Sequence, residues 1–323
     1  MQETINFDVG RAMLEDYLDG YPARLDIADA LPLNQALMTG VIVPDARLLT
    51  FEQDGLLYAL PTSLVLAYNV IQGRTKADQP WMLTFCNACN TGMLFNPVVD
   101  GQLLHFRRRG AYDGLLLIWD EETNSYWQHI TGRSMHGSSR GKQLQTITTT
   151  RQMSALEAGA LHSNALLLTS TLSPAQEKLS YAMEKMRANP DRVEERIVST
   201  IGHEDTRRPR FELGLGVWAH GISSFYPLVL LHTVNNALIT NFDGRPLLIY
   251  QTPEAISPVA AFVETTHAAW EGSVLRLDHG ATIHNDMLYT PDKHGQPLET
   301  PQQLLMRWYG FALTFPDCAV ATV

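Results

Sequence analysis

Hydrophobic and polar positions alternate in short runs through most of the chain, and this pattern predicts a structure dominated by β-strands. Between residues 51 and about 171, apolar runs such as 83–85 and 115–119 are separated by Gly, Asn, Asp and Pro. Runs of this length and period are typical of strands. The dipeptide Asp100-Gly101 between two apolar runs is the strongest hairpin signal in the chain. We therefore expect mainly antiparallel sheets.

Helical spacing appears in three segments: residues 61–71, 154–162 and 173–189. The third is the clearest, because Ser173 and Pro174 form an N-cap and first-turn pair and Leu179 and two later methionines repeat along one face. A shorter amphipathic segment at 11–18 ends before a Gly and a Pro, and we expect it to be a packing arm.

The order of these signals recurs in the second half of the chain. Pro61 and Pro227 each open an apolar helix, and each follows a glycine by six residues. An asparagine, Asn69 or Asn235, lies eight residues after each proline, and an apolar strand follows in both copies. Recurrence of a whole pattern is the sequence signature of a repeated unit, so we predict an internal duplication.

The predicted fold is α+β, with two related, mainly antiparallel-sheet modules and a few helices. Aligned on their strands, Cys86 and Cys89 of the first copy correspond to Gln251 and Glu254 of the second. The second copy is therefore expected to be degenerate. The predicted parts are an N-terminal arm (1–50), a first module with the cysteine pair (51–172), a helical linker (173–210) and a second module (211–323).

Composition narrows the classes of function. The 323 residues carry 24 Lys and Arg against 34 Asp and Glu, a net charge of −10, which argues against a nucleic-acid partner. The N-terminus lacks the features of a signal peptide, and no apolar run approaches the ~18 residues of a membrane span. We expect a soluble, cytoplasmic protein with no membrane partner, and a homodimer remains open. Three cysteines have the wrong parity for a disulfide framework.

The segment Cys86-Asn87-Ala88-Cys89 is the one motif with a mechanism attached to it. Two thiols at this spacing after a strand can chelate one metal ion or form a disulfide. The other interpretation is that the two cysteines are small apolar side chains buried in the core. A zinc ribbon needs a second pair, which the sequence lacks, and covalent haem attachment needs His where Asn90 stands. A hairpin is expected after the pair, whereas a thioredoxin-like site would have a helix there.

A metal held by this pair needs one or two further ligands, for which histidine is the preferred type. His129 is the first candidate and His105, across the predicted hairpin, is the second. Thiolate and imidazole suit one transition metal ion, copper, iron or zinc, which the sequence does not distinguish. His279, His284 and Asp286 mimic a second ligand set, but the predicted loop around them favours a solvated turn.

A basic run, Arg107-Arg108-Arg109, lies close to the cysteine motif in this acidic chain. It either holds a small anionic substrate, with Arg107 and Arg109 as the predicted contacts, or forms a solvated strand edge. Trp127 is expected to line and shield the same site. The sequence has no P-loop, G-x-G-x-x-G, G-x-S-x-G or H-E-x-x-H motif, so common nucleotide, serine-hydrolase and zincin chemistries are unsupported.

Together these motifs resemble those of the domain of unknown function 3179 family of bacteria and archaea. Its hallmark is an apolar strand ending in Cys-Pro-Leu-Cys-Gly-Thr/Ser, followed by a hairpin and an Asp-x-x-Thr-x-Ser-x-Trp segment. The corresponding segments of this chain are 84–95, 99–106 and 120–127. The resemblance covers residues 55–171 well and 214–318 more weakly. It implies that Cys86 and Cys89 are the motif cysteines and Trp127 the motif tryptophan, and it implies no established activity.

Two departures from the family pattern concern the site. Many members carry Trp-His-Glu on the first helix, where this chain has Ala67-Tyr68-Asn69. Many carry Gln two residues after the motif tryptophan, where this chain has His129. If the family site uses the helix histidine, its loss here either removes the site or marks a branch in which His129 takes over.

The function predicted from these observations is that of a metal-binding redox protein, in its enzymatic form an oxidoreductase on a small anionic substrate. The expected partners are therefore a small-molecule substrate or a metal. One alternative is a non-catalytic metal-trafficking or ligand-binding module, which a closed site without an adjacent cavity favours. The other is a dithiol/disulfide redox protein, which binds no metal and has a thiol with a depressed pKa.

Overall fold

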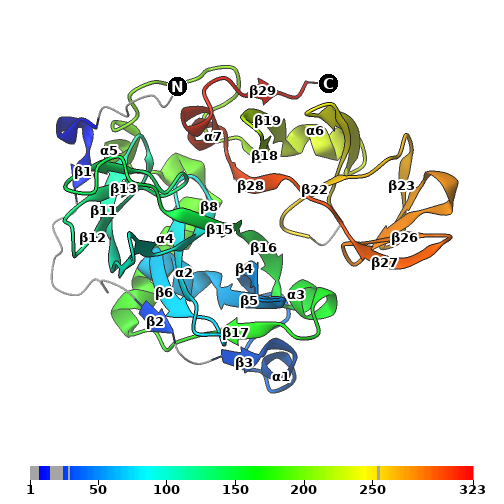
Figure 1. Ribbon diagram of the computed structural model, residues 1–323, viewed down its shortest axis with the longest axis horizontal. Helices are drawn as coiled ribbons and strands as arrows, with labels where there is room; N and C mark the ends of the chain where they lie inside the picture. Colours follow the sequence, from blue (N-terminus) through cyan, green and yellow to red (C-terminus); the bar gives the residue numbers. More distant parts are fainter. Residues whose placement is uncertain (1–6, 15–24, 28–29, 253–254, 323) are drawn as a thin grey trace.

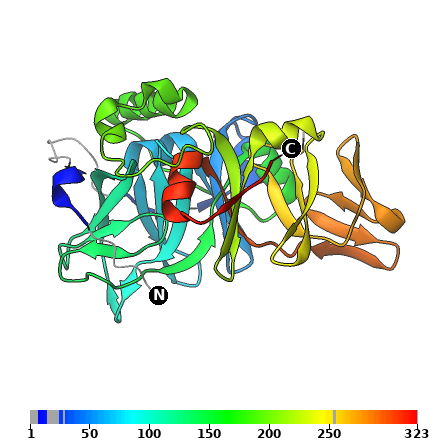
Figure 2. The ribbon, with the colours of Figure 1, turned by 90° about the horizontal axis from the view of Figure 1, so that it is seen from above.

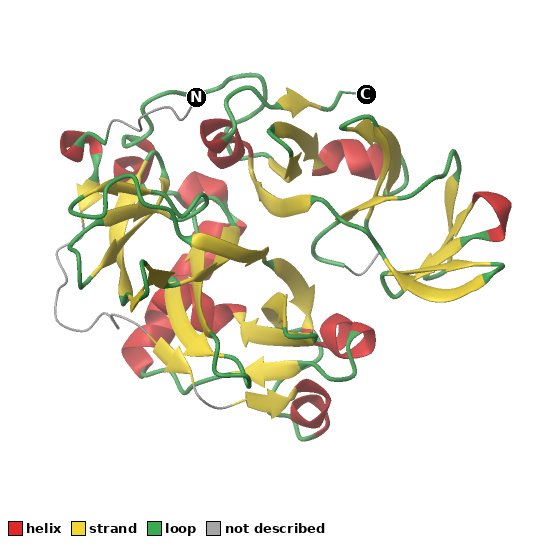
Figure 3. Cartoon of the chain, in the orientation of Figure 1, coloured by secondary structure: helices red, strands yellow, loops and turns green. Residues whose placement is uncertain are grey.

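The computed structural model describes residues 7–14, 25–27, 30–252 and 255–322, and these residues form an α+β structure (Figures 1 and 3). Nearly all strand pairs in these segments are antiparallel, with seven α-helices among them. The predicted fold class is thus confirmed. None of the described helices is long and apolar enough to cross a membrane.

The first half contains three five-stranded sheets and a small hairpin. The first sheet has the order β1 (Met13–Leu14), β11 (Phe106–Tyr112), β12 (Leu115–Asp120), β13 (Tyr126–Gln128) and β14 (Ser134–His136). The second has the order β15 (Gln145–Thr149), β8 (Thr91–Asn96), β7 (Pro80–Cys86), β6 (Val70–Arg74) and β2 (Leu25–Ile27). The third has the order β16 (Arg151–Ser154), β4 (Arg47–Gln53), β5 (Leu56–Pro61), β17 (Leu166–Leu168) and β3 (Ala30–Pro32).

The predicted hairpin at Asp100-Gly101 is present and joins β9 (Val98–Val99) to β10 (Gln102–Leu103). Both turn residues have positive φ, 51° and 81°, as a tight two-residue turn between antiparallel strands requires. The segment 11–14 contributes strand β1, which pairs with β11, while residues 15–18 of the predicted packing arm lie outside the described residues.

All three predicted helices are present. The helices of this half are α1 (Leu33–Met38), α2 (Thr62–Tyr68), α3 (Ala155–Leu161), α4 (Pro174–Ala188) and α5 (Glu195–Val198), with 3-10 turns at Val9–Arg11 and Pro190–Arg192. The first was predicted to reach residue 71, but α2 ends at Tyr68 because Asn69 adopts a left-handed φ of 59° and directs the chain into β6. Helix α4 packs on α2 and covers one side of the first half (Figure 2).

The second half contains three smaller sheets. Their strands are β28 (Gln302–Arg307), β18 (Leu213–Ala219), β19 (Ile222–Pro227) and β29 (Ala319–Val320); β20 (Ala237–Phe242), β21 (Arg245–Tyr250) and β22 (Val259–Phe262); and β23 (Ala268–Glu271), β24 (Val274–Leu277), β25 (Thr282–His284), β26 (Met287–Thr290) and β27 (Lys293–Pro297). The helices are α6 (Leu228–Thr233) and α7 (Trp308–Thr314), with a 3-10 turn at Asp278–Gly280.

The same order of elements recurs in the two halves. A hairpin, a short helix after a proline, and a second hairpin form β4-β5-α2-β6-β7 in the first half and β18-β19-α6-β20-β21 in the second. Asn69 and Asn235 both have positive φ after the helix. The internal duplication itself stays a prediction.

The segment formed by β28 and α7 returns from the second half and packs against the first. One buried core contains Cys86, Cys89 and Trp127 from the first half together with Trp308 and Phe311 of α7. Strand β28 also contacts β8, β15 and β16. The two halves therefore share a core at the position of the cysteine motif.

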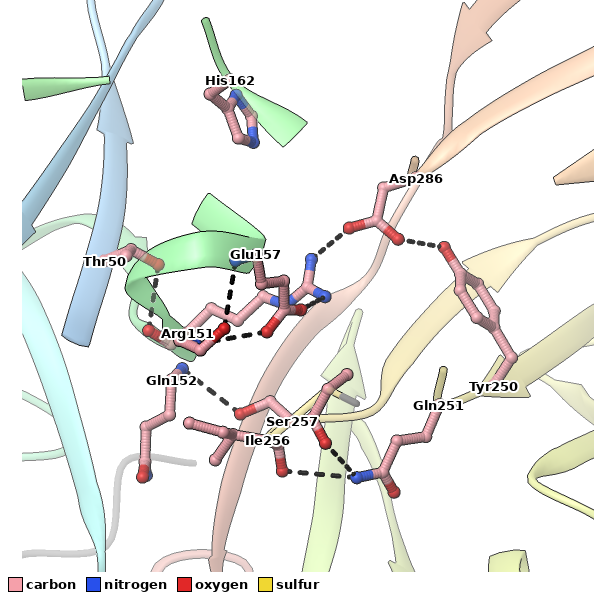
Figure 4. A network of polar contacts seen from close by, with 12 residues as sticks. Thr50, Arg151, Gln152, Glu157, His162, Tyr250, Gln251, Ile256, Ser257 and Asp286 are labelled. Atoms are coloured by element: carbon pink, nitrogen blue, oxygen red, sulfur yellow. Dashed lines mark hydrogen bonds and ion pairs between the residues drawn. The ribbon is translucent and has the colours of Figure 1, made fainter. Parts of the chain in front are cut away.

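A second connection between the halves is a polar network beside β16 (Figure 4). Arg151 pairs with Glu157 of α3 and with Asp286 in the turn between β25 and β26. The hydroxyl of Tyr250 donates to Asp286 Oδ1 over 2.7 Å. Burial, reinforced by the Asp286 carboxylate, raises the pKa of Tyr250 well above its usual value. The arginine thus bridges two carboxylates that belong to different halves.

Replacing Asp286 with Ala should lower the free energy of unfolding by about 2 kcal/mol, because it leaves the Arg151 charge and the Tyr250 hydroxyl short of a partner. Denaturant unfolding measures this loss. Glu271→Ala is the matched control, since it breaks an exposed pair with Arg276 and should cost less than about 1 kcal/mol. Equal losses in the two variants would contradict the role assigned to the network.

Candidate metal centre

The two thiols lie at the end of β7 and within the tight turn that connects β7 to β8. Cys86 closes β7 and is paired with Thr91, the first residue of β8. Asn90 takes a left-handed φ of 60°, a conformation that Asn tolerates better than most residues, and returns the chain toward β7. The backbone N–H of Cys89 donates to Cys86 Sγ over 3.3 Å. Both side chains are buried and unbridged by a disulfide.

His129 completes a group of three metal-ligand side chains. It follows β13, and its Nε2 lies 3.6 Å from Cys89 Sγ. The ligand atoms of Cys86, Cys89 and His129 all lie within 4.8 Å of one another, and all three residues are buried. The first predicted histidine is thus the one that the fold brings to the thiols.

The separation of sulfur and nitrogen fits a tetrahedral metal site. Sulfur at about 2.3 Å and nitrogen at about 2.05 Å from one zinc ion, separated by a tetrahedral angle, lie about 3.6 Å apart. This agrees with the 3.6 Å between Cys89 Sγ and His129 Nε2. The donor set of two thiolates and one imidazole suits zinc, Cu(I) or iron. The residues present therefore fit a transition metal ion.

A buried carboxylate fixes the loop that positions His129. Asp120, at the end of β12, is fully buried and accepts from the Thr123 hydroxyl and the Trp127 indole N–H, both at 2.7 Å. The backbone N–H groups of Thr123 and Ser125 also donate to it. Several donors thus satisfy a charge that would otherwise be costly to bury. The Asp-x-x-Thr-x-Ser-x-Trp segment is accordingly a structural clamp.

The two thiols have opposite pKa shifts. Burial alone would raise the pKa of Cys86, but hydrogen bonds with Cys89 and His129 outweigh it and hold that pKa well below its usual value. Burial raises the pKa of Cys89 well above its usual value, and the neighbouring Cys86 thiolate raises it further. Without a metal, the turn therefore favours one thiolate and one thiol.

The second half supplies two side chains to the surroundings of the thiols. Arg307, only 2% exposed, donates to the Ala88 carbonyl over 2.9 Å, and its backbone N–H donates to the Cys89 carbonyl over 3.0 Å. Tyr309 is buried beside Cys86, with its hydroxyl bonded to the Gly114 carbonyl at 2.8 Å. Burial, followed by the charge of Cys86, raises the pKa of Tyr309 well above its usual value.

Helix α7 approaches the cysteine turn through a glycine. A Cβ at Gly310 would lie 3.2 Å from Cys89 Cβ and 3.1 Å from a Leu115 methyl, closer than side chains normally pack. Sequence reasoning missed Arg307, Tyr309 and Gly310, because they follow the cysteines by more than two hundred residues. The sole sequence signal is an arginine that precedes the apolar segment of α7.

A cavity of about 400 Å³ opens onto the site and reaches Cys86. Its polar lining beside the thiol consists of Asn69, Asn87 and Arg108. Ala67 and Tyr68, which with Asn69 stand where many family members carry Trp-His-Glu, also line it. The cysteine pair is thus buried in the core on one side and adjoins a cavity on the other.

The structure does not bring three of the predicted site residues to the cavity or to the ligand group: His105, Arg107 and Arg109. The fourth, Trp127, shares the buried core with the thiols but does not line the cavity. His105 instead pairs through Nδ1 with Glu122, and Arg107 pairs with Glu121. Arg109 occupies the irregular pairing between Arg108 and Gly110 and lies outside the cavity lining. Trp127 is enclosed in the core, where it donates to Asp120 and contacts Phe106 edge to face.

The alternation of side chains along β11 explains why Arg108, and not Arg107, lines the cavity. Successive side chains of a strand point to opposite faces, so Arg108 shares a face with buried Phe106, whereas Arg107 lies on the other face. Among the described residues, the one group of three or more potential metal ligands is Cys86, Cys89 and His129. His279, His284 and Asp286 form no such group, and the Asp286 carboxylate pairs instead with Arg151 and Tyr250.

The fold and the site define a mainly antiparallel α+β protein with a buried Cys₂His group that is compatible with metal binding. The sequence model of the family described as Protein of unknown function (DUF3179) matches residues 33–318. This match spans most of the chain, so the chain belongs to that family. The match also confirms the resemblance that the motifs indicated. Neither the curated proteins nor the solved structures contain a match to this chain.

Asp120→Ala should lower the free energy of unfolding by about 3 kcal/mol, because it leaves the Trp127 indole N–H and the Thr123 groups without their acceptor in the core. Chemical denaturation monitored by tryptophan fluorescence checks this. Glu121→Ala, in the same turn, removes a half-exposed partner of Arg107 and should cost about 1 kcal/mol or less. If Asp120→Ala lowers the free energy of unfolding no more than Glu121→Ala does, the clamp role assigned to Asp120 is wrong.

Proposed function

We propose that this chain is a metal-binding redox protein that holds one copper, iron or zinc ion on Cys86, Cys89 and His129. Its enzymatic form would be an oxidoreductase on a small anionic substrate. The observation that carries the proposal is the clustering of three soft ligand atoms within 4.8 Å of one another, in a buried site that adjoins a cavity. When bound, such a metal supplies Lewis-acid or one-electron chemistry.

The chain's own residues prepare the site for cation binding. The turn lowers the pKa of Cys86, which favours the thiolate, the form in which a cysteine binds metal. The Asp120 clamp fixes the strand pair that carries His129. The guanidinium of Arg307 lies close enough to both thiolates to attract them, which offsets part of their mutual repulsion. The cavity then gives a small molecule access to the Cys86 side of the group.

Two alternative functions use the same residues. A trafficking module would enclose its ion, and the cavity at Cys86 favours substrate access over simple storage. A dithiol/disulfide cycle is supported by the depressed pKa of Cys86 and by the two unbridged cysteines. Metal content separates this last possibility from the other two.

The proposed division of the chain follows the same reasoning. The first module (51–172) supplies the ligands, and the second (211–323) supports them through Arg307 and Tyr309. The linker (173–210) contributes part of the cavity wall. Described residues of the proposed arm (1–50) already pair with strands of the first module, as in β1 with β11.

Elemental analysis of tag-free protein tests the metal. We expect about one equivalent of a transition metal per chain in the wild type, and less than about a tenth in Cys86→Ser, Cys89→Ser, because both thiolates are lost. Cys318→Ser is the matched control: it removes the remaining buried cysteine, lies outside the ligand group and should retain the metal. Absence of metal from the wild type after aerobic, anaerobic and reconstituted preparations would refute the proposal and leave thiol redox chemistry.

Measurements of metal affinity distinguish the two histidines that were predicted as ligands. His129→Ala should weaken metal binding at least about a hundredfold in competition with a chromophoric chelator, because one of three protein ligands is lost. His105→Ala should leave the affinity unchanged within about threefold, since its ring pairs with Glu122 away from the thiols. A larger loss for His105 than for His129 would disprove this assignment of ligands.

A further inference from the structure

Arg307 places a cation on the buried side of the cysteine turn. It ends β28 and is 2% exposed. Its Nη1 donates to the Ala88 carbonyl over 2.9 Å and its Nη2 to the Arg187 carbonyl over 2.6 Å, while its backbone N–H donates to the Cys89 carbonyl over 3.0 Å. An arginine side chain keeps its charge at neutral pH. These three bonds therefore hold a positive charge against the turn that carries the thiols.

The thiolates are the anions that balance this charge. In the described parts of the chain, the guanidinium donates to backbone carbonyls, and no carboxylate pairs with it. Cys86 and Cys89, as thiolates, lie close enough to stabilise its charged form. Tyr309 also lies close, but burial raises the pKa of its hydroxyl well above the usual value, so this group is neutral. The counter-charge of Arg307 is therefore supplied by the metal ligands themselves.

The other groups around the turn add no net charge on this side. The side chain of Arg187 donates to Asn90 Oδ1 over 3.3 Å and forms an ion pair with Glu184, so its charge is cancelled within the pair. An imidazole that ligates a metal is neutral, so His129 contributes no charge either. The charge of the buried group is thus set by two thiolates, one guanidinium and the bound ion.

This balance distinguishes monovalent from divalent ions. Two thiolates carry two negative charges, and the guanidinium of Arg307 cancels one of them. A monovalent ion cancels the other and leaves the buried group neutral, whereas a divalent ion leaves one positive charge in excess. An unbalanced charge is costly in a buried site of low dielectric constant. The surroundings of the ligands therefore favour a monovalent ion.

The ligand atoms identify which monovalent ion fits. Thiolate and imidazole are ligands of Cu(I), and alkali cations prefer oxygen. Among the described residues the group has three members, Cys86, Cys89 and His129. Structural zinc sites almost always have four protein ligands, so this set falls one short of a closed zinc site. Charge and ligand number thus point to the same ion.

The cavity that reaches Cys86 has the same ligand preference. Three methionines, Met13 of β1 and Met183 and Met186 of α4, line it together with Cys86. Thioethers are soft ligands that select Cu(I) and bind hydrated dications poorly. Met186 also belongs to the buried core that contains both thiols. Soft sulfur atoms therefore line the approach to the site as well as the site itself.

We propose that the ion held by Cys86, Cys89 and His129 is Cu(I), and that Arg307 selects it by balancing the charge of the second thiolate. This inference rests on the proposed function, because it requires the three ligands to bind a metal, and it names the metal that they bind. Arg307 contacts the turn and not the ion, so it is a positioning and charge-balancing residue.

Competition titrations test the role of the charge. Affinity for Cu(I) is measured without oxygen against bicinchoninate, and affinity for Zn(II) against a chromophoric zinc chelator. Arg307→Met should lower the ratio of Cu(I) to Zn(II) affinity at least about tenfold, because the guanidinium repels the extra charge of the divalent complex alone. Arg307→Lys keeps the charge and should keep the ratio within about threefold. Both affinities start from the same metal-free protein, so its protonation cancels in the ratio.

The double variant Glu184→Gln, Arg187→Met is the matched control. It removes the neighbouring arginine together with its carboxylate, so the net charge beside the turn is unchanged and the ratio should stay within about threefold of the wild type. An unchanged ratio in Arg307→Met, or an equal fall in the double variant, would overturn the proposal.

X-ray absorption spectroscopy of the wild type gives a test that holds even if Arg307→Met does not fold. After exposure to equal amounts of Cu(I) and Zn(II) without oxygen, we expect copper bound by two sulfur atoms and one imidazole nitrogen. Zinc bound by these ligands would refute the choice of Cu(I) and leave the metal function standing. Absence of both ions from the wild type would refute the metal function itself.

Discussion

The architecture of this protein depends on the burial of one guanidinium, that of Arg307, beneath the cysteine turn. A charge on a residue that is 2% exposed needs partners, and here the backbone carbonyls of Ala88 and Arg187 accept from Nη1 and Nη2, while Nε is buried without a hydrogen-bond partner. Burial lowers the pKa of Arg307, while the nearby tyrosine and thiolates oppose that shift. Ala88 belongs to the first half, Arg187 to helix α4 of the linker and Arg307 to the second half, so this contact joins all three segments.

Around this contact the site is assembled from units with separate tasks. The β7–β8 turn presents the thiols, the Asp120 clamp fixes the strands that place His129, and α7 closes the buried side through Gly310. Backbone pairing holds the thiol turn and a bonded carboxylate holds the clamp, whereas His129 Nδ1 is buried without a hydrogen-bond partner. The fold of the chain itself thus brings Cys86, Cys89 and His129 together.

The open side of the site has a different character. Asn69, Asn87 and Arg108 form a bonded polar end, and methionines and leucines form the wall. The linker between the halves thereby gains a second role, since α4 and α5 cover the space that leads to Cys86. The Arg151 network meanwhile connects the sheet of β23–β27 to the first half, through the pair between Arg151 and Asp286.

The sequence by itself determined the local elements and the chemistry they carry. Alternation, caps and turn residues predicted the strands, the helix at 173–189, the Asp100-Gly101 hairpin and the cysteine motif, because each depends on neighbours within a few residues. Tertiary structure alone decided that His129 rather than His105 meets the thiols, that Arg108 rather than Arg107 faces the cavity, and that Arg307 lies beneath the turn. Those outcomes depend on strand faces and on packing between segments far apart in the chain, which no local pattern encodes.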